Sequence, residues 1–281
     1  MRKGWIERGT LGLLLFFSAP VWSTGIISIN LCSDLLLYDL ADRDQIQSLS
    51  YFAKDRHYSP IVDKLDDIPI NSGRIEQIIA ARPSLVLASA YSSAMVLDML
   101  KRFDIETYSL YSPQSLAQLY EAMRELGVKI GQSKKAEHRI AALQLALQND
   151  ELERDESTSL GAIYLSPNGY SEGRGTLTHE LITLAGYTNL TADLGAWHTI
   201  SLEQIIALKP DVIISAQGSE HYDRAHEWLS HPAIQAVPAH VIIPAAYWSC
   251  ASSHLALAYQ TLLERRTEIL NNLSSAQEDE S

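Results

Sequence analysis

Aromatic side chains flank the predicted strands of this chain at positions where a ligand could meet them. In an open α/β sheet, ligands bind beyond the carboxyl ends of the strands. Rings there offer a large contact area at a small cost in conformational entropy. Any single ring could instead pack into the nearest core, but rings in loop after loop favour a shared ligand-binding face. The candidates are Tyr51, Tyr91, Tyr170, Trp197, His198, Tyr247 and Trp248.

A turn that contains two glycines, residues 171–176 (SEGRGT), comes directly before a predicted helix. Its backbone N–H groups and the guanidinium of Arg174 could hold an anion, although it could equally be a plain turn. It lacks the lysine of a nucleotide-binding P-loop. We therefore expect no nucleotide ligand.

The sequence contains none of the common motifs of enzyme chemistry. No Gly-x-Ser-x-Gly nucleophile elbow occurs, and His226-Glu227 is not followed by a histidine at the spacing of a zinc protease. The nine histidines are scattered. Each is more readily explained as a surface or hydrogen-bonded residue than as a metal ligand. We expect neither an enzyme nor a resident cofactor.

One stretch of the chain occurs twice, as RIEQIIAARPSLVLAS at residues 74–89 and as SLEQIIALKPDVIISA at residues 201–216. Each copy predicts an amphipathic helix, a proline stop and a buried strand. Any α/β chain could reuse such a unit, but here Glu-Gln-Ile-Ile-Ala recurs in register. The repeat therefore indicates two lobes of similar design. Glu76 and Glu203 fall in the first turn of the two helices, where an acid also favours the helix dipole.

The alternation of strands and helices predicts an α/β fold of two lobes, each a mostly parallel sheet flanked by helices. We expect the N-terminal lobe at residues 24–131 and the C-terminal lobe at 158–273. Residues 132–157 contain neither proline nor glycine. Within them, the roughly 24 residues at positions 133–156 predict one long α-helix of roughly 36 Å that joins the lobes, with an ordinary surface helix as the alternative. Residues 274–281 are expected to be a disordered tail.

The first 23 residues predict a secretory signal peptide, cleaved near Ser23. Arg2, Lys3 and Arg8 precede a short apolar core at residues 11–17, which is too short to span a bilayer; an uncleaved anchor is the alternative. No later run is long enough to cross a membrane, so we expect an exported mature chain that does not insert into the bilayer. The net charge of −12 leaves no basic footprint for nucleic acid.

The chain contains two cysteines, Cys32 and Cys250. In an exported protein an even number of cysteines often forms disulfides. Sequence alone does not place these two within bridging distance. A disulfide and a pair of free thiols are both left open.

An exported two-lobed α/β chain of this kind resembles the periplasmic binding proteins that serve ABC importers of siderophores, haem and vitamin B12. The resemblance covers nearly all of the mature chain. Its most specific parts are the Glu-x-Ile-hydrophobic-Ala-x-x-Pro pattern of both repeats and Gly-Tyr-x-x-Gly-Arg-Gly-Thr at residues 169–176. In outline the chain is nearest to the members that bind vitamin B12. Their disulfide, however, lies within the second lobe, whereas Cys32 belongs to the first.

The resemblance implies that a metal chelate is captured between the lobes and delivered to a permease dimer with its ATPase. The chelate would be a ferric siderophore, a corrinoid such as cobalamin, or haem, and the receptor would be a monomer. Glu76 and Glu203 would engage arginines of the permease. Cys32 and Cys250 could face each other on the cleft side, either bridged as a disulfide or acting as soft ligands of a metal. The expected ligand-binding residues are Tyr51, Arg74, Tyr91, Tyr170, Arg174, Trp197, His198, Tyr247 and Trp248.

Two other functions are compatible with the sequence. A receptor for bare zinc or manganese would need three or four His and carboxylate side chains that converge between the lobes. A periplasmic enzyme that acts on a metal complex is a further alternative, which the missing catalytic motifs disfavour.

Overall fold

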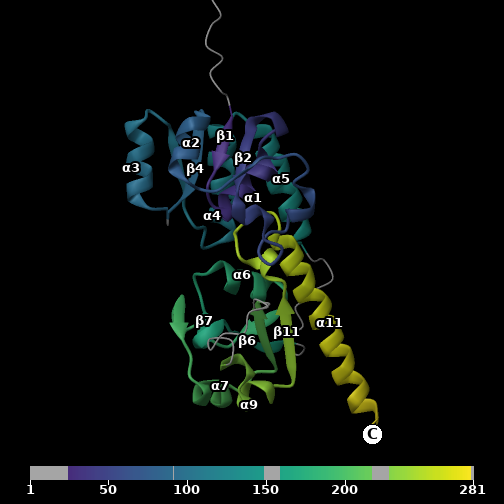
Figure 1. Ribbon diagram of the computed structural model, residues 1–281. Coiled ribbons are helices and arrows are strands. Elements are labelled where there is room, and N and C mark those ends of the chain that lie inside the picture. The colour runs from purple at the N-terminus through teal and green to yellow at the C-terminus, as the bar shows by residue number, and fades with distance from the viewer. Residues whose placement is uncertain (1–24, 91, 149–158, 217–227, 280–281) are drawn as a thin grey trace, which may run out of the picture.

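The computed structural model describes residues 25–90, 92–148, 159–216 and 228–279. The chain forms two α/β lobes stacked one on the other, the first drawn in purple to teal and the second in green to yellow (Figure 1). The predicted fold class of two parallel sheets flanked by helices is confirmed. The signal peptide predicted at residues 1–23 lies outside the described residues.

The first lobe is a five-stranded parallel sheet in the order β3-β2-β1-β4-β5. Its strands are β1 Ile26–Ser28, β2 Ile46–Ser50, β3 Ile70–Asn71, β4 Leu85–Ser89 and β5 Thr107–Leu110. Its helices are α1 Leu31–Leu40, α2 Ile75–Ala81, α3 Ala94–Arg102, α4 Leu116–Lys129 and α5 Ser133–Ala146. Buried residues on both faces of the central strands explain why these strands read as continuous apolar runs.

The second lobe is a four-stranded parallel sheet in the order β11-β10-β6-β8, accompanied by a separate antiparallel ribbon of β7 and β9. The strands are β6 Leu160–Tyr164, β7 Tyr170–Glu172, β8 Tyr187–Asn189, β9 Trp197–Thr199, β10 Val212–Ala216 and β11 Ala239–Ile243. The helices are α6 Leu177–Leu184, α7 Leu202–Leu208, α9 Pro232–Gln235, α10 Ala245–Trp248 and α11 Leu255–Asp279.

The two copies of the repeat adopt the same local structure in the two lobes. α2 ends at Arg82 and α7 at Lys209, and both capping residues are left-handed, with φ of 45° and 47°. A proline follows each cap, so neither helix can continue. Ile78 and Ile205 are buried at equivalent positions of the two helices. The structural repetition predicted from the sequence is therefore confirmed.

The helix expected to join the lobes is shorter than residues 132–157, and this prediction is wrong in its length. α5 ends at Ala146, after roughly 21 Å, and Leu147 forms its C-cap. Ile140, Leu143 and Leu147 form its buried face. The helix thus ends where its buried face ends, at Leu147, and packing supplies most of a helix's stability. Residues 149–158 lie outside the described part of the chain.

The tail expected to be disordered at residues 274–281 is instead helical through Asp279, because α11 continues into it. Extending an existing helix adds one hydrogen bond per residue without the cost of a new nucleus. The hydroxyl of Ser274 also donates to the carbonyl of Leu270 at 3.1 Å. The prediction is therefore wrong for residues 274–279.

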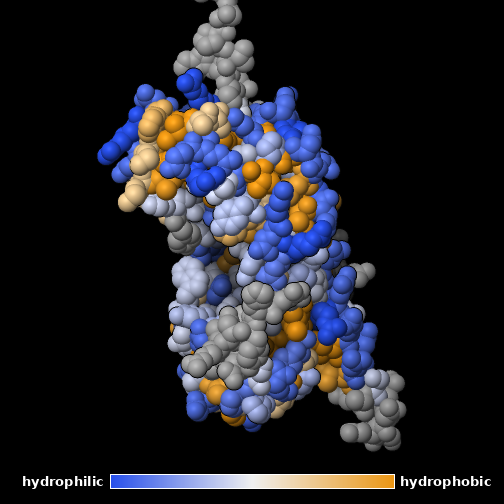
Figure 2. Space-filling model, in the orientation of Figure 1, coloured by the Kyte–Doolittle hydropathy of each residue, from blue (hydrophilic) through white to orange (hydrophobic). Residues whose placement is uncertain are grey.

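One apolar cluster extends through both lobes. It includes Leu35 and Met123 of the first lobe together with Leu181 and Leu262 of the second, all at most 1% exposed. Two smaller clusters lie within single lobes, one around Ile78 and the other around Ile205. The surface is hollowed between the lobes on the face shown in Figure 2. The lobes are therefore joined along a shared core and separate from each other at the recess.

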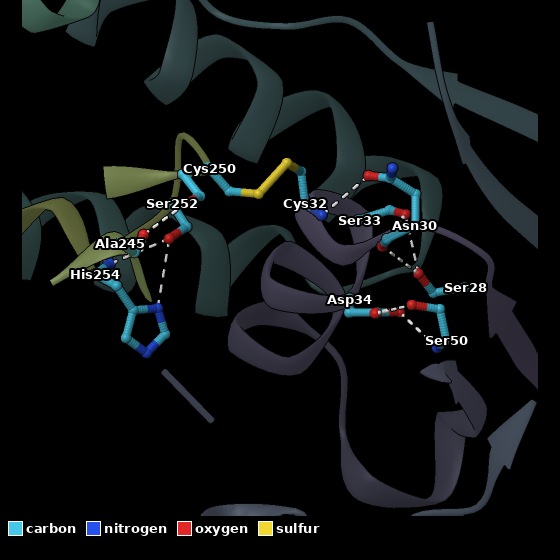
Figure 3. Close-up of a disulfide and its surroundings, with 11 residues drawn as sticks. Ser28, Asn30, Cys32, Ser33, Asp34, Ser50, Ala245, Cys250, Ser252 and His254 are labelled. Carbon is cyan, nitrogen blue, oxygen red and sulfur yellow. Dashed lines mark hydrogen bonds between the residues drawn. A yellow bond between two sulfur atoms is a disulfide. The ribbon is translucent and has the colours of Figure 1, made fainter. Parts of the chain in front are cut away.

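Polar and covalent links cross between the lobes beside this shared core. The backbone N–H of Leu116 donates to the carboxylate of Glu180 at 2.7 Å, and the hydroxyl of Ser253 donates to Asp39 at 2.6 Å. Cys32 and Cys250 form a disulfide, with a Cα–Cα distance of 5.2 Å (Figure 3). Of the two alternatives left open by the sequence, the structure has the bridged pair.

A buried carboxylate lies in the first turn of α1, close to the disulfide (Figure 3). Asp34 is fully buried and accepts hydrogen bonds from the backbone N–H and the hydroxyl of Ser50. Burial raises its pKa from 3.8 to about 6, although the hydrogen bonds from Ser28 and Ser50 oppose this shift. The protonated form is thus favoured in the folded chain relative to the unfolded one.

We predict that the Cys32→Ser, Cys250→Ser double variant loses roughly 3–5 kcal/mol of unfolding free energy, because the disulfide closes a long loop. The two cysteines are separated by 218 residues. Thermal unfolding should show a large fall in Tm for the variant, and a reducing agent should lower the Tm of the wild type alone. Equal melting temperatures for the oxidised wild type and the variant would contradict this prediction.

We predict that the unfolding free energy of the wild type falls as the pH rises from about 4 to about 7. Across this window the folded chain holds the Asp34 proton that the unfolded chain releases, so stability is lost as pH rises through the raised pKa. The total is roughly 3 kcal/mol. Urea denaturation over a pH series should show this fall removed in Asp34→Asn and retained in Asp44→Asn, which changes an exposed carboxylate. A slope unchanged by Asp34→Asn would refute the assignment.

Candidate functional site

The carboxyl ends of the two parallel sheets face each other across the gap between the lobes. Cys32 follows β1 of the first sheet, and Cys250 follows β11 of the second. The disulfide between them therefore brings the two strand-end edges together. Parallel sheets bind ligands beyond this edge, so the site should lie beside the bridge.

A cleft of about 230 Å³ lies at this junction. The loop after β5 contributes three residues of the first lobe, and the ribbon, α6 and the segment around α10 contribute the rest. Two predicted site residues, Trp197 and Trp248, are among those that line it. The complete lining is Ser112, Pro113, Gln114, Glu172, Leu177, Thr178, Leu181, Trp197, Trp248, Ser249, Ala251 and Leu255.

The β7–β9 ribbon decides which of its side chains reach the cleft. Glu172 pairs directly with Trp197, and Ser171 pairs with His198. Directly paired residues lie on the same face of a ribbon, and neighbouring residues along a strand alternate between faces. Tyr170 therefore shares the face of Glu172 and Trp197, with 57% of its surface exposed. His198 lies on the opposite face and is not part of the cleft lining.

The ring of Trp248 is held in place by an aromatic contact with Tyr164. The two rings stack, with centroids 5.6 Å apart and planes inclined by 25°. Tyr164 is buried at the end of β6, and its hydroxyl accepts a hydrogen bond from Ser166 at 3.0 Å. Tyr247, the neighbouring candidate, packs against the apolar core. Of this adjacent pair, only Trp248 lines the cleft.

The turn at residues 171–176 does not present free donors for an anion. The backbone N–H groups of Gly173 and Arg174 already donate to the carbonyls of Ala196 and Ala192. The guanidinium of Arg174 is paired with the carboxylate of Asp193 at 3.0 Å, and both side chains are mostly exposed. Arg174 is not among the residues that line the cleft.

The same turn positions a carboxylate instead. A Cβ on Gly173 would lie 2.5 Å from the carbonyl oxygen of Gly195, so only glycine allows the ribbon and the turn to pack this closely. Thr176 caps α6 through its hydroxyl. Burial raises the pKa of Glu172, while hydrogen bonds from the Thr178 and Thr176 side chains lower it. Glu172 thus lies half-buried in the cleft wall.

Sequence reasoning missed Glu172, although it stands inside the Gly-Tyr-x-x-Gly-Arg-Gly-Thr pattern. The pattern drew attention to Arg174, because a cation beside glycines is typical of anion sites. Only the pairing of β7 with β9 reveals that Glu172 and Trp197 share one face. Gln114 and Thr178, also in the lining, carry no signal in the sequence.

The remaining candidates of the first lobe lie apart from this lining. Tyr51 begins a 3₁₀ turn after β2 and has 53% of its surface exposed, with its ring 4.0 Å from that of Phe52. Arg74 precedes α2, and its Nε donates to the hydroxyl of Ser72 at 3.1 Å. Both follow strands whose carboxyl ends face the second lobe. Their roles as ligand contacts remain predictions. Tyr91 lies outside the described residues.

Within the described residues, no three His, Cys, Asp or Glu side chains gather in a way that could hold a metal ion. None of the described helices combines the length and the apolar composition that crossing a bilayer requires.

Comparison with known proteins gives a consistent assignment. The family model described as periplasmic binding protein matches residues 26–240. An uncharacterised ABC transporter substrate-binding lipoprotein of Bacillus subtilis (strain 168), YvrC, is 28% identical over 167 residues, or 56% of this chain and 52% of that protein. The vitamin B12-binding protein of Salmonella paratyphi A is 27% identical over 165 residues, or 57% of this chain and 61% of that protein. The matched region thus spans little more than half of these relatives.

The fold is also shared with solved structures. A possible iron-binding (periplasmic solute-binding) protein from Staphylococcus epidermidis superposes with a TM-score of 0.68 at 19% identity, over 88% of this chain and 98% of that one. At this identity the likeness establishes the fold.

Proposed function

The chain belongs to the periplasmic binding protein family, and on that premise we propose that it captures a metal chelate between its lobes for an ABC importer. The chelate is a ferric siderophore, a corrinoid such as cobalamin, or haem. The observation that carries the proposal is the cleft at the facing strand ends, which two tryptophans line from two separate elements of the second lobe. Two flat indole rings within a partly polar lining suit the large rings and polar rims of metal chelates.

The chelate is cargo in this proposal and no resident cofactor is needed. Vitamin B12 is named in one relative and iron in one structural neighbour. These names support a metal chelate as the class of ligand. They do not choose among its members.

The connection between the lobes favours capture with little closure. The shared apolar cluster, the Cys32–Cys250 disulfide and the hydrogen bond from Leu116 to Glu180 all lie between the lobes. A large hinge motion would break this packing. We therefore infer a receptor whose cleft is largely formed before the ligand arrives, which lowers the entropy cost of binding.

Docking onto a permease is proposed for Glu76 and Glu203. Both side chains are exposed, and they occupy equivalent positions in the first turns of α2 and α7. A hydrogen bond from the Ser201 side chain lowers the pKa of Glu203, which keeps it charged. One carboxylate on each lobe suits a partner made of two equivalent subunits with basic residues. Such charges at the rim mainly steer encounter and fix register.

We place the mature chain in the periplasm as a monomer. The family and the predicted signal peptide at residues 1–23 support this location. The ATPase of the importer would act on the permease and make no contact with this chain.

We predict that a metal chelate quenches the tryptophan fluorescence of the protein when titrated to low micromolar concentration. Trp197 is 61% exposed in the cleft wall, and absorbing chelates bound beside it would accept its excitation energy. The panel should include cobalamin, ferric hydroxamate and catecholate siderophores, and haemin. The Trp197→Phe variant should show a smaller change in fluorescence, and the remainder should come mainly from Trp248, which also lines the cleft. If no member of the panel changes the fluorescence or binds by calorimetry, the proposal fails.

We predict that the Glu76→Ala, Glu203→Ala double variant binds chelate normally but abolishes uptake. Neither carboxylate lines the cleft, so only docking should suffer. Uptake of labelled chelate by cells that express the cognate permease measures the effect. Asp44→Ala with Glu264→Ala, which also removes one exposed carboxylate from each lobe, serves as the control. Normal transport by the Glu76, Glu203 variant would exclude the docking role.

A further inference from the structure

We propose that Glu172 determines the ligand specificity of the cleft: it selects chelates that present amide or ammonium N–H donors between Trp197 and Trp248, and it disfavours chelates that present carboxylates there. This inference rests on the proposed function and narrows the class of its ligand.

The described lining of the cleft carries a negative charge. Glu172 is the one residue of its lining, as far as the chain is described, that carries a formal charge at neutral pH. The first lobe contributes Ser112 and Gln114, which are neutral hydrogen-bonding groups. The rest of the wall is aliphatic, aromatic or hydroxylic. A ligand that enters this cleft therefore meets a negative potential with no cation in the lining.

Arg174 and His179, the basic residues that follow Glu172 in the chain, do not offset this charge. Arg174 is paired with Asp193 at 3.0 Å in an exposed position, so its field at the cleft is both neutralised and screened. Burial, with Arg174 nearby, lowers the pKa of His179, so this imidazole is neutral. Its Nδ1 lies 3.3 Å from the side-chain amide of Asn189. A carboxylate of a ligand would find no partner for its charge here.

The carboxylate of Glu172 has hydrogen-bonding capacity to offer a ligand. The Thr178 and Thr176 side chains at the start of α6 lower the pKa of its carboxyl against the effect of burial, although the Thr176 hydroxyl donates its proton to the carbonyl of Gly173 at 2.8 Å. A carboxylate has about four lone-pair positions and no donor when it is ionised. Two threonines leave acceptor capacity unused, and only a donor can satisfy it.

Glu172 is also paired with Trp197. The two residues are directly opposite on the β7–β9 ribbon, so the carboxylate and the indole lie side by side. Trp248 adds a second ring, fixed by Tyr164. An ammonium or a polarised amide N–H is attracted both by the carboxylate and by an indole face. The arrangement therefore suits a donor group carried on a flat or apolar ligand surface.

The role of Glu172 in the fold does not require its charge. Its backbone carbonyl accepts hydrogen bonds from Asn189 at 2.9 Å and from Thr191 at 3.4 Å, and neither contact involves the side chain. Glu172→Gln keeps the shape and these backbone bonds while it removes the charge. Glu172→Asp keeps the charge on a shorter side chain.

The test is a fluorescence titration of four proteins: wild type, Glu172→Gln, Glu172→Asp and the control Glu264→Gln, an exposed glutamate of α11. The probes are dicyanocobinamide, whose rim carries amides; ferrioxamine B, a ferric hydroxamate with an ammonium group; and haemin, which carries carboxylates. The wild type should bind at least one of the first two at least tenfold more tightly than haemin. Glu172→Gln should weaken that ligand about tenfold, as expected for a lost charge-assisted hydrogen bond, and should not weaken haemin. Glu172→Asp and Glu264→Gln should keep the wild-type order.

The outcomes separate the two proposals. If haemin binds the wild type more tightly than both donor-bearing chelates, or if Glu172→Gln changes their affinities less than twofold, the role of Glu172 is refuted while chelate binding stands. If no probe binds the wild type, and the wider chelate panel also fails, the proposed function itself is refuted and this inference with it. Thermal unfolding of each variant establishes that it is folded before it is titrated.

Discussion

The packing of the two lobes on one continuous apolar core is the constraint on which the rest of the structure depends. Residues from α1, α4 and α5 of the first lobe and from α6 and α11 of the second belong to a single buried cluster. That packing fixes the lobes with the carboxyl ends of both sheets facing each other. The disulfide of Cys32 with Cys250 reinforces the same arrangement from the strand ends. The cleft exists because these links hold the edges at a set separation.

A second consequence of that packing is electrostatic. Placing the ribbon at the cleft buries Glu172 far enough to raise its pKa, while the neighbouring Thr178 and Thr176 side chains oppose that shift. The wall therefore combines apolar rings with one negative group. Such a wall discriminates by charge as much as by shape, since an unpaired ionic group in a desolvated site is costly. Selectivity among chelates can arise from a single residue in this setting.

The duplicated helix-proline-strand unit serves two purposes in the two lobes. Ile78 and Ile205 of its helices are buried in separate clusters behind each sheet, and the left-handed caps at Arg82 and Lys209 end both helices alike. Glu76 and Glu203 face solvent at matching places. A core does not require acids there, whereas the proposed docking onto two permease subunits would use them. The duplication thus links the construction of the lobes to the proposed docking.

The sequence by itself determined the features that depend on neighbouring residues. Helical periodicity, proline stops and β-branched runs were enough for the α/β class, the two lobes and the repeat. Trp248, after the last predicted strand, and Trp197, before the second repeat helix, were both identified as candidates. Local signals failed at the end of α5 and in the last turns of α11, because the length of a helix depends on what its face packs against and on whether it is already nucleated. The tertiary structure alone decided the rest. It joined Cys32 to Cys250 across 218 residues, neutralised Arg174 with Asp193, and placed Glu172 beside Trp197. These are contacts between residues distant in the chain, and only the folding that brings their elements together can select them.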